Sequence, residues 1–203
     1  LPGDAAQVEF VGGTAFVSAE PAASWRGGVV LVDVTDPARP ATLGTIGPRK
    51  IGATMDSAAF AVDGDRLYLA EWLVEFADVL SVRVIDVADP AGPVDLGEVL
   101  WANRFEDSPN LAAAFTNGFA IVTTTPRNGA EGEIGVIDVS EPGRATRLGS
   151  VPLEAWFDMT ALFPALPTGW SVEARAPRIA VGDGTVFVAH GVNGLVAYDL
   201  VVG

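Results

Sequence analysis

Several residue types are missing or rare in this sequence, and each scarcity excludes a kind of chemistry. There is no cysteine, which excludes disulfides, thiolate metal sites and cysteine nucleophiles together. The single histidine, His190, cannot form the multi-histidine set of a typical catalytic zinc site. No apolar run reaches the ~18 residues of a membrane-spanning helix, so we expect no membrane span.

Basic residues are also scarce, and the formal net charge is −14. Nucleic-acid binding depends on Lys and Arg side chains that neutralise phosphates, so this composition argues against a nucleic-acid partner. Anionic membrane surfaces are disfavoured for the same reason. The 49% hydrophobic content is nevertheless enough for a buried core, and 203 residues suffice for one all-β domain.

The most informative pattern is a short apolar run that ends in aspartate and occurs four times. The runs lie about 50 to 60 residues apart, an interval typical of stacked copies of one supersecondary unit. They are 29–33, 82–86, 134–138 and 195–199, ending at Asp33, Asp86, Asp138 and Asp199.

Two further features divide each copy into strands. Before each aspartate run lies a dipeptide that tolerates positive φ, as a two-residue hairpin turn requires. These turns are predicted at Gly12-Gly13, Asp63-Gly64, Asn117-Gly118 and Asp183-Gly184. After the run, a proline turn leads in three copies to Leu-Gly, at 43–44, 96–97 and 148–149.

Four antiparallel strands per repeat predict an all-β β-propeller with about four blades. We treat residues 1–203 as one propeller domain or segment. The predicted blades are about 7–55, 56–108, 109–177 and 178–203, with an aromatic-rich insertion between blades at 151–177.

The three segments that best carry the repeat are 30–37, 84–90 and 136–142, where Ile/Val-Asp-Val is followed by an acidic residue and proline. Their pattern closely resembles the LVIVD-repeat family of bacterial β-propellers. The resemblance extends over nearly the whole chain, although Leu200-Val201-Val202 replaces the Asp-Pro turn in the fourth copy. It implies a propeller, often on an exported or cell-surface bacterial protein, with a cytoplasmic location still open. It implies no reaction and assigns no catalytic residue.

The fourth copy lacks a fourth strand, which raises the question of ring closure. An open propeller would expose strand edges and an apolar blade face. Our hypothesis is that the chain is part of a larger ring, completed by further blades or by another chain. The alternative is a small four-bladed ring with one thin blade.

In an up-and-down meander, the links from second to third strands and the links between blades emerge on one face. We expect these links to be long there, and long loops in compact domains are usually functional. All five tryptophans map to them: Trp25, Trp72, Trp101, Trp156 and Trp170. They either form a recognition surface or pack beneath their own loops. The 151–177 insertion is likewise either a docking element or a cover for the fourth blade.

Aligned copies place titratable side chains near the same channel mouth, chiefly Glu71, Asp107 and His190. They are incidental, bind a divalent cation, or supply a base for proton transfer. We expect the repeat aspartates to accept backbone N–H groups from neighbouring turns rather than to bind metal.

The sequence therefore favours a non-catalytic scaffold that binds a protein or ligand through its long-loop face, with no catalytic residue, no metal site and no cofactor. A structural divalent cation is a minor alternative. The alternative function is an enzyme or enzyme subunit, of hydrolase or lyase type, with its pocket near Glu71, Asp107 and His190.

Overall fold

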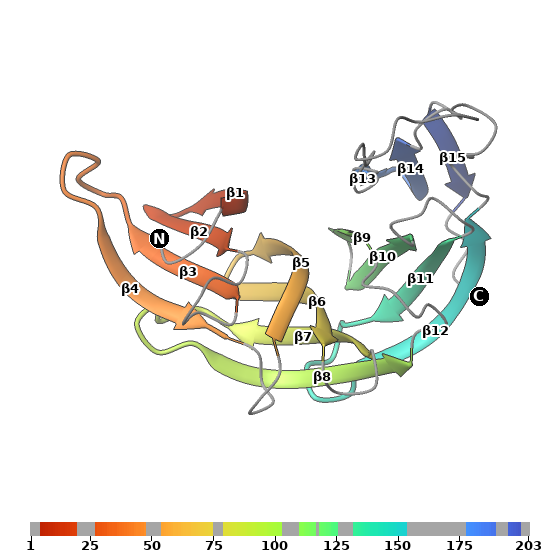
Figure 1. Ribbon diagram of the computed structural model, residues 1–203, viewed down its shortest axis with the longest axis horizontal. Helices are drawn as coiled ribbons and strands as arrows, with labels where there is room; N and C mark the ends of the chain where they lie inside the picture. Colours follow the sequence, from red (N-terminus) through yellow and green to blue (C-terminus); the bar gives the residue numbers. More distant parts are fainter. Residues whose placement is uncertain are drawn as a thin grey trace, which may run out of the picture.

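The computed structural model describes residues 5–19, 27–47, 54–74, 79–102, 110–116, 118–125, 132–153, 178–189 and 195–199. Within these residues the secondary structure consists of fifteen β-strands without a helix, so no helix there could cross a membrane. The strands form four separate antiparallel sheets, each following chain order (Figure 1).

The first sheet contains β1 (Ala5–Val11), β2 (Thr14–Ala19), β3 (Gly28–Asp33) and β4 (Ala41–Ile46). The second contains β5 (Thr54–Asp63), β6 (Arg66–Val74), β7 (Val79–Asp86) and β8 (Val94–Ala102). The third contains β9 (Asn110–Thr116), β10 (Phe119–Thr125), β11 (Gly132–Asp138) and β12 (Thr146–Leu153). The described part of the fourth contains β13 (Arg178–Gly182), β14 (Thr185–Ala189) and β15 (Leu195–Asp199).

The sheets follow one another along an arc, like propeller blades (Figure 1). The first strand of each sheet lies on the inner side, where β1 contacts β5, β5 contacts β9 and β9 contacts β13. The fourth strand lies on the outer side. The all-β prediction with blade-like antiparallel sheets is thus confirmed, and the described sheets form an open arc rather than a closed ring.

The hairpin that opens each sheet has two turn residues, and one predicted turn was misplaced by one position. In the second sheet Asp63 pairs with Arg66, so the turn is Gly64-Asp65 rather than Asp63-Gly64. The reason is a repeated backbone hydrogen bond: the carbonyl of the second turn residue accepts the N–H that follows the repeat aspartate. Asp65 accepts from Val87 at 2.8 Å, as Gly13 accepts from Val34 at 2.9 Å.

The repeat aspartates shape the turn after the third strand, as predicted. A carboxylate oxygen of Asp33 accepts the Thr35 N–H at 2.9 Å, that of Asp86 accepts the Ala88 N–H at 2.9 Å, and that of Asp138 accepts the Ser140 N–H at 3.0 Å. Each bond closes an Asx turn, in which the aspartate side chain accepts the N–H of the residue two positions further on. The turns 34–40, 87–93 and 139–145 have the same length, and each begins with this hydrogen bond.

The Leu-Gly marker brings neighbouring sheets together at their outer strands. A Cβ placed on Gly44 would lie 2.5 Å from the carbonyl oxygen of Pro90, in the next sheet's turn. A Cβ on Gly97 would lie 2.5 Å from the backbone nitrogen of Gly143, again in the following sheet. Glycine is therefore needed where one sheet's outer strand receives the next sheet's proline turn.

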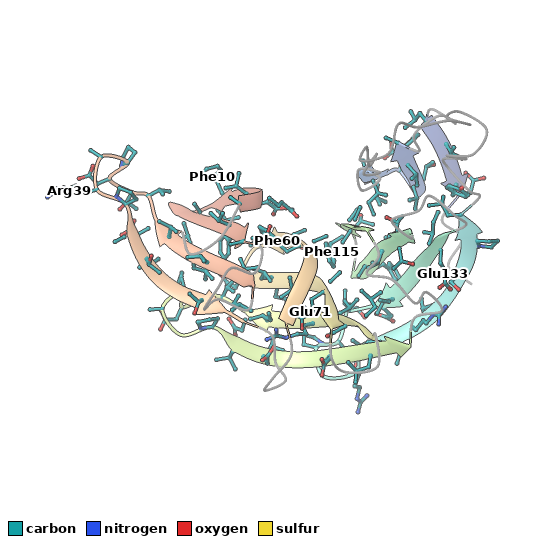
Figure 2. The ribbon with its side chains drawn as sticks, in the orientation of Figure 1. Phe10, Arg39, Phe60, Glu71, Phe115 and Glu133 are labelled. Atoms are coloured by element: carbon teal, nitrogen blue, oxygen red, sulfur yellow. The ribbon has the colours of Figure 1, made fainter. Side chains whose placement is uncertain are left out.

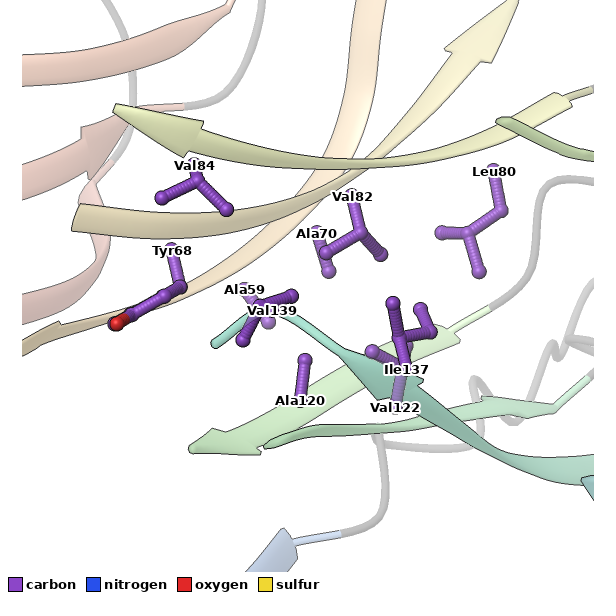
Figure 3. Close-up of a cluster of buried hydrophobic side chains, with 10 residues drawn as sticks. All are labelled: Ala59, Tyr68, Ala70, Leu80, Val82, Val84, Ala120, Val122, Ile137 and Val139. Carbon is purple, nitrogen blue, oxygen red and sulfur yellow. The ribbon is translucent and has the colours of Figure 1, made fainter. Parts of the chain in front are cut away.

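Apolar side chains fill the space between consecutive sheets. The cluster between the second and third sheets includes Tyr68, Val82, Val122 and Ile137 (Figure 3). Similar clusters join the first sheet to the second and the third to the fourth. Tyr68 also stacks on Phe115 across the second interface, with ring centroids 4.9 Å apart. The core is thus a series of sheet-to-sheet interfaces, as expected for stacked repeats.

Candidate functional site at the variable end

The two ends of the sheets differ in regularity. At one end the chain makes two-residue hairpin turns and the three equal proline turns; we call this the turn end. At the other, the variable end, second strands are joined to third strands by 20–27, 75–78, 126–131 and 190–194. Consecutive sheets are joined there by 47–53, 103–109 and 154–177. Since one scaffold carries such unequal links, the variable end is the candidate site.

A charged cluster with two buried members, Glu71 and Arg83, lies in the second sheet; Figure 2 labels Glu71. We call it the Arg83 cluster, and it contains Glu71, Ser81, Arg83, Asp95 and Glu98. Arg83 is only 3% exposed and Glu71 is fully buried. Leu69 lies two residues before Glu71 in β6, and Ile85 lies two residues after Arg83 in β7, so each shares a sheet face with that charged residue. Leu69 and Ile85 both pack toward the first sheet.

Arg83 is the centre of this cluster. Its Nε and Nη2 donate to Asp95 in a forked arrangement, at 2.8 to 3.0 Å. Its Nη1 lies 3.4 Å from both carboxylate oxygens of Glu71. Forked pairing fixes the orientation of the guanidinium plane as well as its position.

The cluster also ties the second sheet to the first. Arg83 Nη1 donates to the backbone carbonyl of Gly47 at 2.9 Å, immediately after β4 ends. On the inner side, the Gln7 side chain bonds both backbone groups of Phe60, and Glu9 accepts the Val62 N–H at 2.9 Å. Polar side chains of the first sheet thus satisfy the free edge of β5. The Arg83–Gly47 contact joins the two sheets toward the variable end, whereas the Gln7 and Glu9 contacts join them nearer the turn end.

Glu71 has an unusual titration because of its surroundings. Burial raises the pKa of Glu71 to about 7, opposed by the attraction of Arg83 and reinforced by the repulsion of Glu98. Such a carboxyl group exchanges a proton near neutral pH. It has no exposed surface, however, so its described surroundings support positioning rather than contact with a substrate.

Trp72 and Trp101, predicted in loops, lie instead in strands β6 and β8. Strand β6 continues to Val74 and β8 to Ala102, so both tryptophan positions precede the links at the variable end. Trp72 of β6 and Trp101 of β8 both pair with Leu80 of β7, the strand that lies between them. The three residues therefore form one row across the sheet. Glu71 is likewise within β6. The aligned backbone, rather than a loop, brings these positions together.

The remaining predicted site residues lie outside the described residues. They are Trp25, Asp107, Trp156, Trp170 and His190. The proposed convergence of Glu71 with Asp107 and His190 therefore stays a prediction. In the described part of the chain, no three or more His, Asp or Glu residues are grouped as a metal site would require. A shallow hollow of about 490 Å³, lined partly by Asp138 and Arg144, lies at the turn end instead.

Arg83, Asp95 and Glu98 were not predicted from the sequence. A signal was available, since Arg83 interrupts the apolar run Val82-Arg83-Val84-Ile85 where the first and fourth copies have valine. A cation in a strand covered on both faces needs a carboxylate partner. That requirement points to a buried acidic neighbour but does not say which one.

Comparison with protein-family models matches residues 2–46 to the LVIVD repeat. The matched segment extends to the end of the first sheet, which confirms the family resemblance inferred from the aspartate runs. The same aspartate turns in the second and third sheets extend the repeat structurally. A search of curated proteins found no match.

Proposed function

We propose that this propeller-like protein is a non-catalytic scaffold that binds a protein or ligand at its variable end. The observation that carries the proposal is the contrast between the two ends. Three proline turns are the same length and are closed by the same Asx hydrogen bond, whereas the opposite links range from 75–78 to 154–177. Variation confined to one end of a fixed frame is typical of a recognition surface.

The Arg83 cluster supports this proposal because it makes the frame stiff where the variable links attach. A binding surface built on packed strands keeps its geometry better than one carried by isolated loops. Trp25, Trp72, Trp101, Trp156 and Trp170 are the proposed contacts, together with Glu71, Asp107 and His190. The resemblance to exported repeat proteins supports a partner outside the cytoplasm as part of this proposal.

The test compares variants at the two ends. Purified wild-type chain is immobilised and exposed to a bacterial envelope extract, and the retained proteins are quantified by mass spectrometry. One variant replaces 154–177 by a short Gly-Ser linker, and a second carries Trp25→Ala and Trp156→Ala. The control carries Arg39→Ala and Arg144→Ala at the turn end, where both side chains are exposed.

We expect the control to retain the same partner as the wild type and both variable-end variants to lose it, with unchanged melting temperatures. Retention of the same proteins by all four samples would exclude recognition at the variable end. An enzyme remains the second candidate because the pKa of Glu71 is raised to about 7. Turnover of an ester or lyase substrate that Glu71→Gln abolishes, without loss of folding, would favour the enzyme.

A further inference from the structure

We propose that Glu71 and Arg83 form a proton-operated latch between the first and second sheets. In this latch Arg83 holds the Gly47 carbonyl while Glu71 is protonated, and ionisation of Glu71 draws the guanidinium away from that carbonyl. The latch goes beyond the proposed function, because it acts within the frame of sheets and needs no partner. It is carried by the way in which the N–H groups of Arg83 are shared among their acceptors.

Two acceptor residues compete for one nitrogen of Arg83. The N–H groups of Nε and Nη2 are directed to Asp95, at 2.8 to 3.0 Å. Those of Nη1 lie near three oxygen atoms: the Gly47 carbonyl oxygen at 2.9 Å and both carboxyl oxygens of Glu71 at 3.4 Å. An Nη atom carries only two protons, so Gly47 and Glu71 share an insufficient supply of donors. In this structure Gly47 has the shorter contact.

The protonation state of Glu71 decides this competition. A charge-assisted hydrogen bond between a guanidinium and a carboxylate is about 2.7–2.9 Å long, and a neutral carboxyl group is a weaker acceptor. The separation of 3.4 Å from both Glu71 oxygens is longer and matches a neutral group. Ionised Glu71 would pull Nη1 toward β6, whereas Gly47 follows β4 in the other sheet.

The Gly47 carbonyl is not free to follow the guanidinium. Gly28 packs against the same stretch of backbone: a Cβ placed on it would collide with the Ile46 carbonyl oxygen and lie 3.3 Å from the Gly47 Cα. Arg83 in turn stays anchored by its fork to Asp95, so Nη1 can pivot but the guanidinium cannot shift as a whole. A pivot that shortens the contact with Glu71 therefore lengthens the contact with Gly47.

Few other charges surround Glu71 in the described part of the chain. In the second sheet they are Arg83, Asp95 and Glu98, and the Ser81 hydroxyl donates to Glu98 at 2.8 Å. The row of first-sheet residues beside Gly47 is buried and carries no charge. It consists of Ser18, Val29 and Ile46. On the remaining side, Ala58 of β5 pairs with Glu71. The side chain of Asp56, also in β5, is not among those described, so the experiment includes it.

The titration of Glu71 places the change near neutral pH. Burial raises the pKa of Glu71 to about 7, opposed by Arg83 and reinforced by Glu98 and Asp95. The neutral form therefore prevails below about pH 7 and the charged form above it. We expect Arg83 to hold Gly47 in acid and to release it as the pH rises through this value.

The first and third sheets lack this pair of residues. The register identifies the equivalent positions in each sheet, counted from the repeat aspartate and its partner in the second strand. They are occupied by Ala19 and Val30 in the first sheet and by Thr124 and Gly135 in the third. None of these four side chains is a carboxyl group or a guanidinium. The latch is therefore specific to the joint between the first and second sheets.

The latch acts where the chain leaves the first sheet for the second. Gly47 directly follows β4 and begins the link 47–53, so the loss of its bond to Arg83 removes a tie between the sheets toward the variable end. Binding at the variable end should then weaken above about pH 7. This consequence rests on the proposed function, whereas the latch itself does not.

The experiment is NMR of the whole chain with carbonyl-¹³C glycine, ¹⁵N proline and ¹⁵N arginine. The sequence contains two Gly-Pro pairs, Gly47-Pro48 and Gly92-Pro93, so two carbonyl signals are coupled to a proline nitrogen, and Gly92→Ala tells them apart. Between pH 5 and pH 8 we expect the Gly47 carbonyl to shift with a midpoint near 7, while Gly92, in a proline turn, stays unchanged. A coupling across the hydrogen bond from Arg83 Nη1 to the Gly47 carbonyl should be present at pH 5 and lost at pH 8.

Glu71→Gln should hold the Gly47 carbonyl at its acid position at every pH. Asp56→Asn should titrate like the wild type, and a flat profile in this variant would assign the titration to Asp56 and overturn the proposal. The wild type decides the matter even if Glu71→Gln does not fold, because the carboxyl carbon of Glu71 can be titrated alongside Gly47 with ¹³C glutamate.

Two results in the wild type overturn the latch. One is a Glu71 carboxyl that ionises between pH 5 and pH 8 while the Gly47 shift and the coupling stay constant. The other is a Glu71 carboxyl that does not ionise in this range. If the latch operates but no partner is retained at the variable end, the proposed function fails and the latch stands.

Discussion

The backbone of Gly97 in β8 lies against the backbone of Gly143, in the turn between β11 and β12. A Cβ on Gly97 would be 2.5 Å from the Gly143 nitrogen and 2.8 Å from its Cα. Backbone atoms in a turn cannot move aside as a flexible side chain can. This contact explains why the Leu-Gly dipeptide and the proline turn recur together: the glycine of one sheet packs against the proline turn of the next sheet.

Gly97→Ala should therefore destabilise the fold by about 1–3 kcal/mol, the usual cost of forcing an extra carbon into a packed contact. Gly149→Ala is the matched control, because the equivalent Cβ in the third sheet meets nothing within 4 Å. We expect it to change stability by less than about 0.5 kcal/mol. Urea unfolding of both variants measures the difference, and equal losses would contradict the contact.

Arg83→Met should reduce the free energy of unfolding by about 3–5 kcal/mol, because it leaves the buried carboxyl group of Glu71 without its cation. The control is Arg39→Ala, since Arg39 pairs with Asp36 at an exposed site and should contribute at most about 1 kcal/mol. Arg83→Lys distinguishes charge from geometry, because an ammonium group keeps the charge but cannot form the fork to Asp95. Its loss of unfolding free energy should lie between the losses of Arg83→Met and Arg39→Ala. A loss no larger than that of Arg39→Ala would show that the cluster is not a structural tie.

Glu71 should make stability fall as the pH rises from about 4.5 to about 7. Its folded-state pKa, about 7, lies above the ordinary value of 4.5, so the folded state binds the proton more tightly than the unfolded state. The stabilisation is fully present below pH 4.5 and is lost as the pH passes through the folded-state pKa, a change of about 3 kcal/mol.

Glu71→Gln is the corresponding variant, because it keeps the size and an oxygen for Arg83 but cannot ionise. We expect its unfolding free energy, measured in urea between pH 5 and pH 8, to lose the fall seen in the wild type. Asp33 and Asp138, whose pKa values are lowered, titrate below this window and leave it unaffected. An unchanged pH profile would mean that Glu71 is charged in the folded state throughout.

The turn end was largely predictable because its structure follows from local chemistry. Asp33, for example, forms its turn with a residue two positions away, and such hydrogen bonds are legible from neighbouring residues alone. The turn at Gly64-Asp65 was shifted because Gly64 has an acidic neighbour on each side, and only the backbone bond to Val87 distinguishes them.

The variable end was predicted poorly because its strands depend on partners distant in sequence. Glu71 was predicted near the channel mouth, whereas it continues the buried strand β6. It does so here because Arg83 on the neighbouring strand compensates its charge, and Asp95 fixes Arg83 in turn. Once Glu71 is accommodated, β6 can continue through Trp72 to Val74.

The hydroxyl groups of Thr35 and Ser140 allow a final test of the aspartate turns. The Thr35 hydroxyl donates to Asp33 at 2.7 Å, and it is the largest cause of the lowered pKa of that carboxyl group. Ser140 acts in the same way on Asp138, at 2.6 Å. Thr35→Val removes the first hydroxyl but keeps its shape and the backbone N–H donor.

We expect Thr35→Val to raise the pKa of Asp33 toward its ordinary value of 3.8 while the pKa of Asp138 stays where it is. Ser140→Ala should give the opposite pattern. Because a depressed pKa stabilises the fold above the unfolded value and this contribution disappears as the pH falls, each variant should also be less sensitive to acid. Carboxyl-carbon NMR titration follows both aspartates in one sample. If one substitution shifted both pKa values, or neither, the lowered pKa of each aspartate could not be attributed to the hydroxyl group beside it.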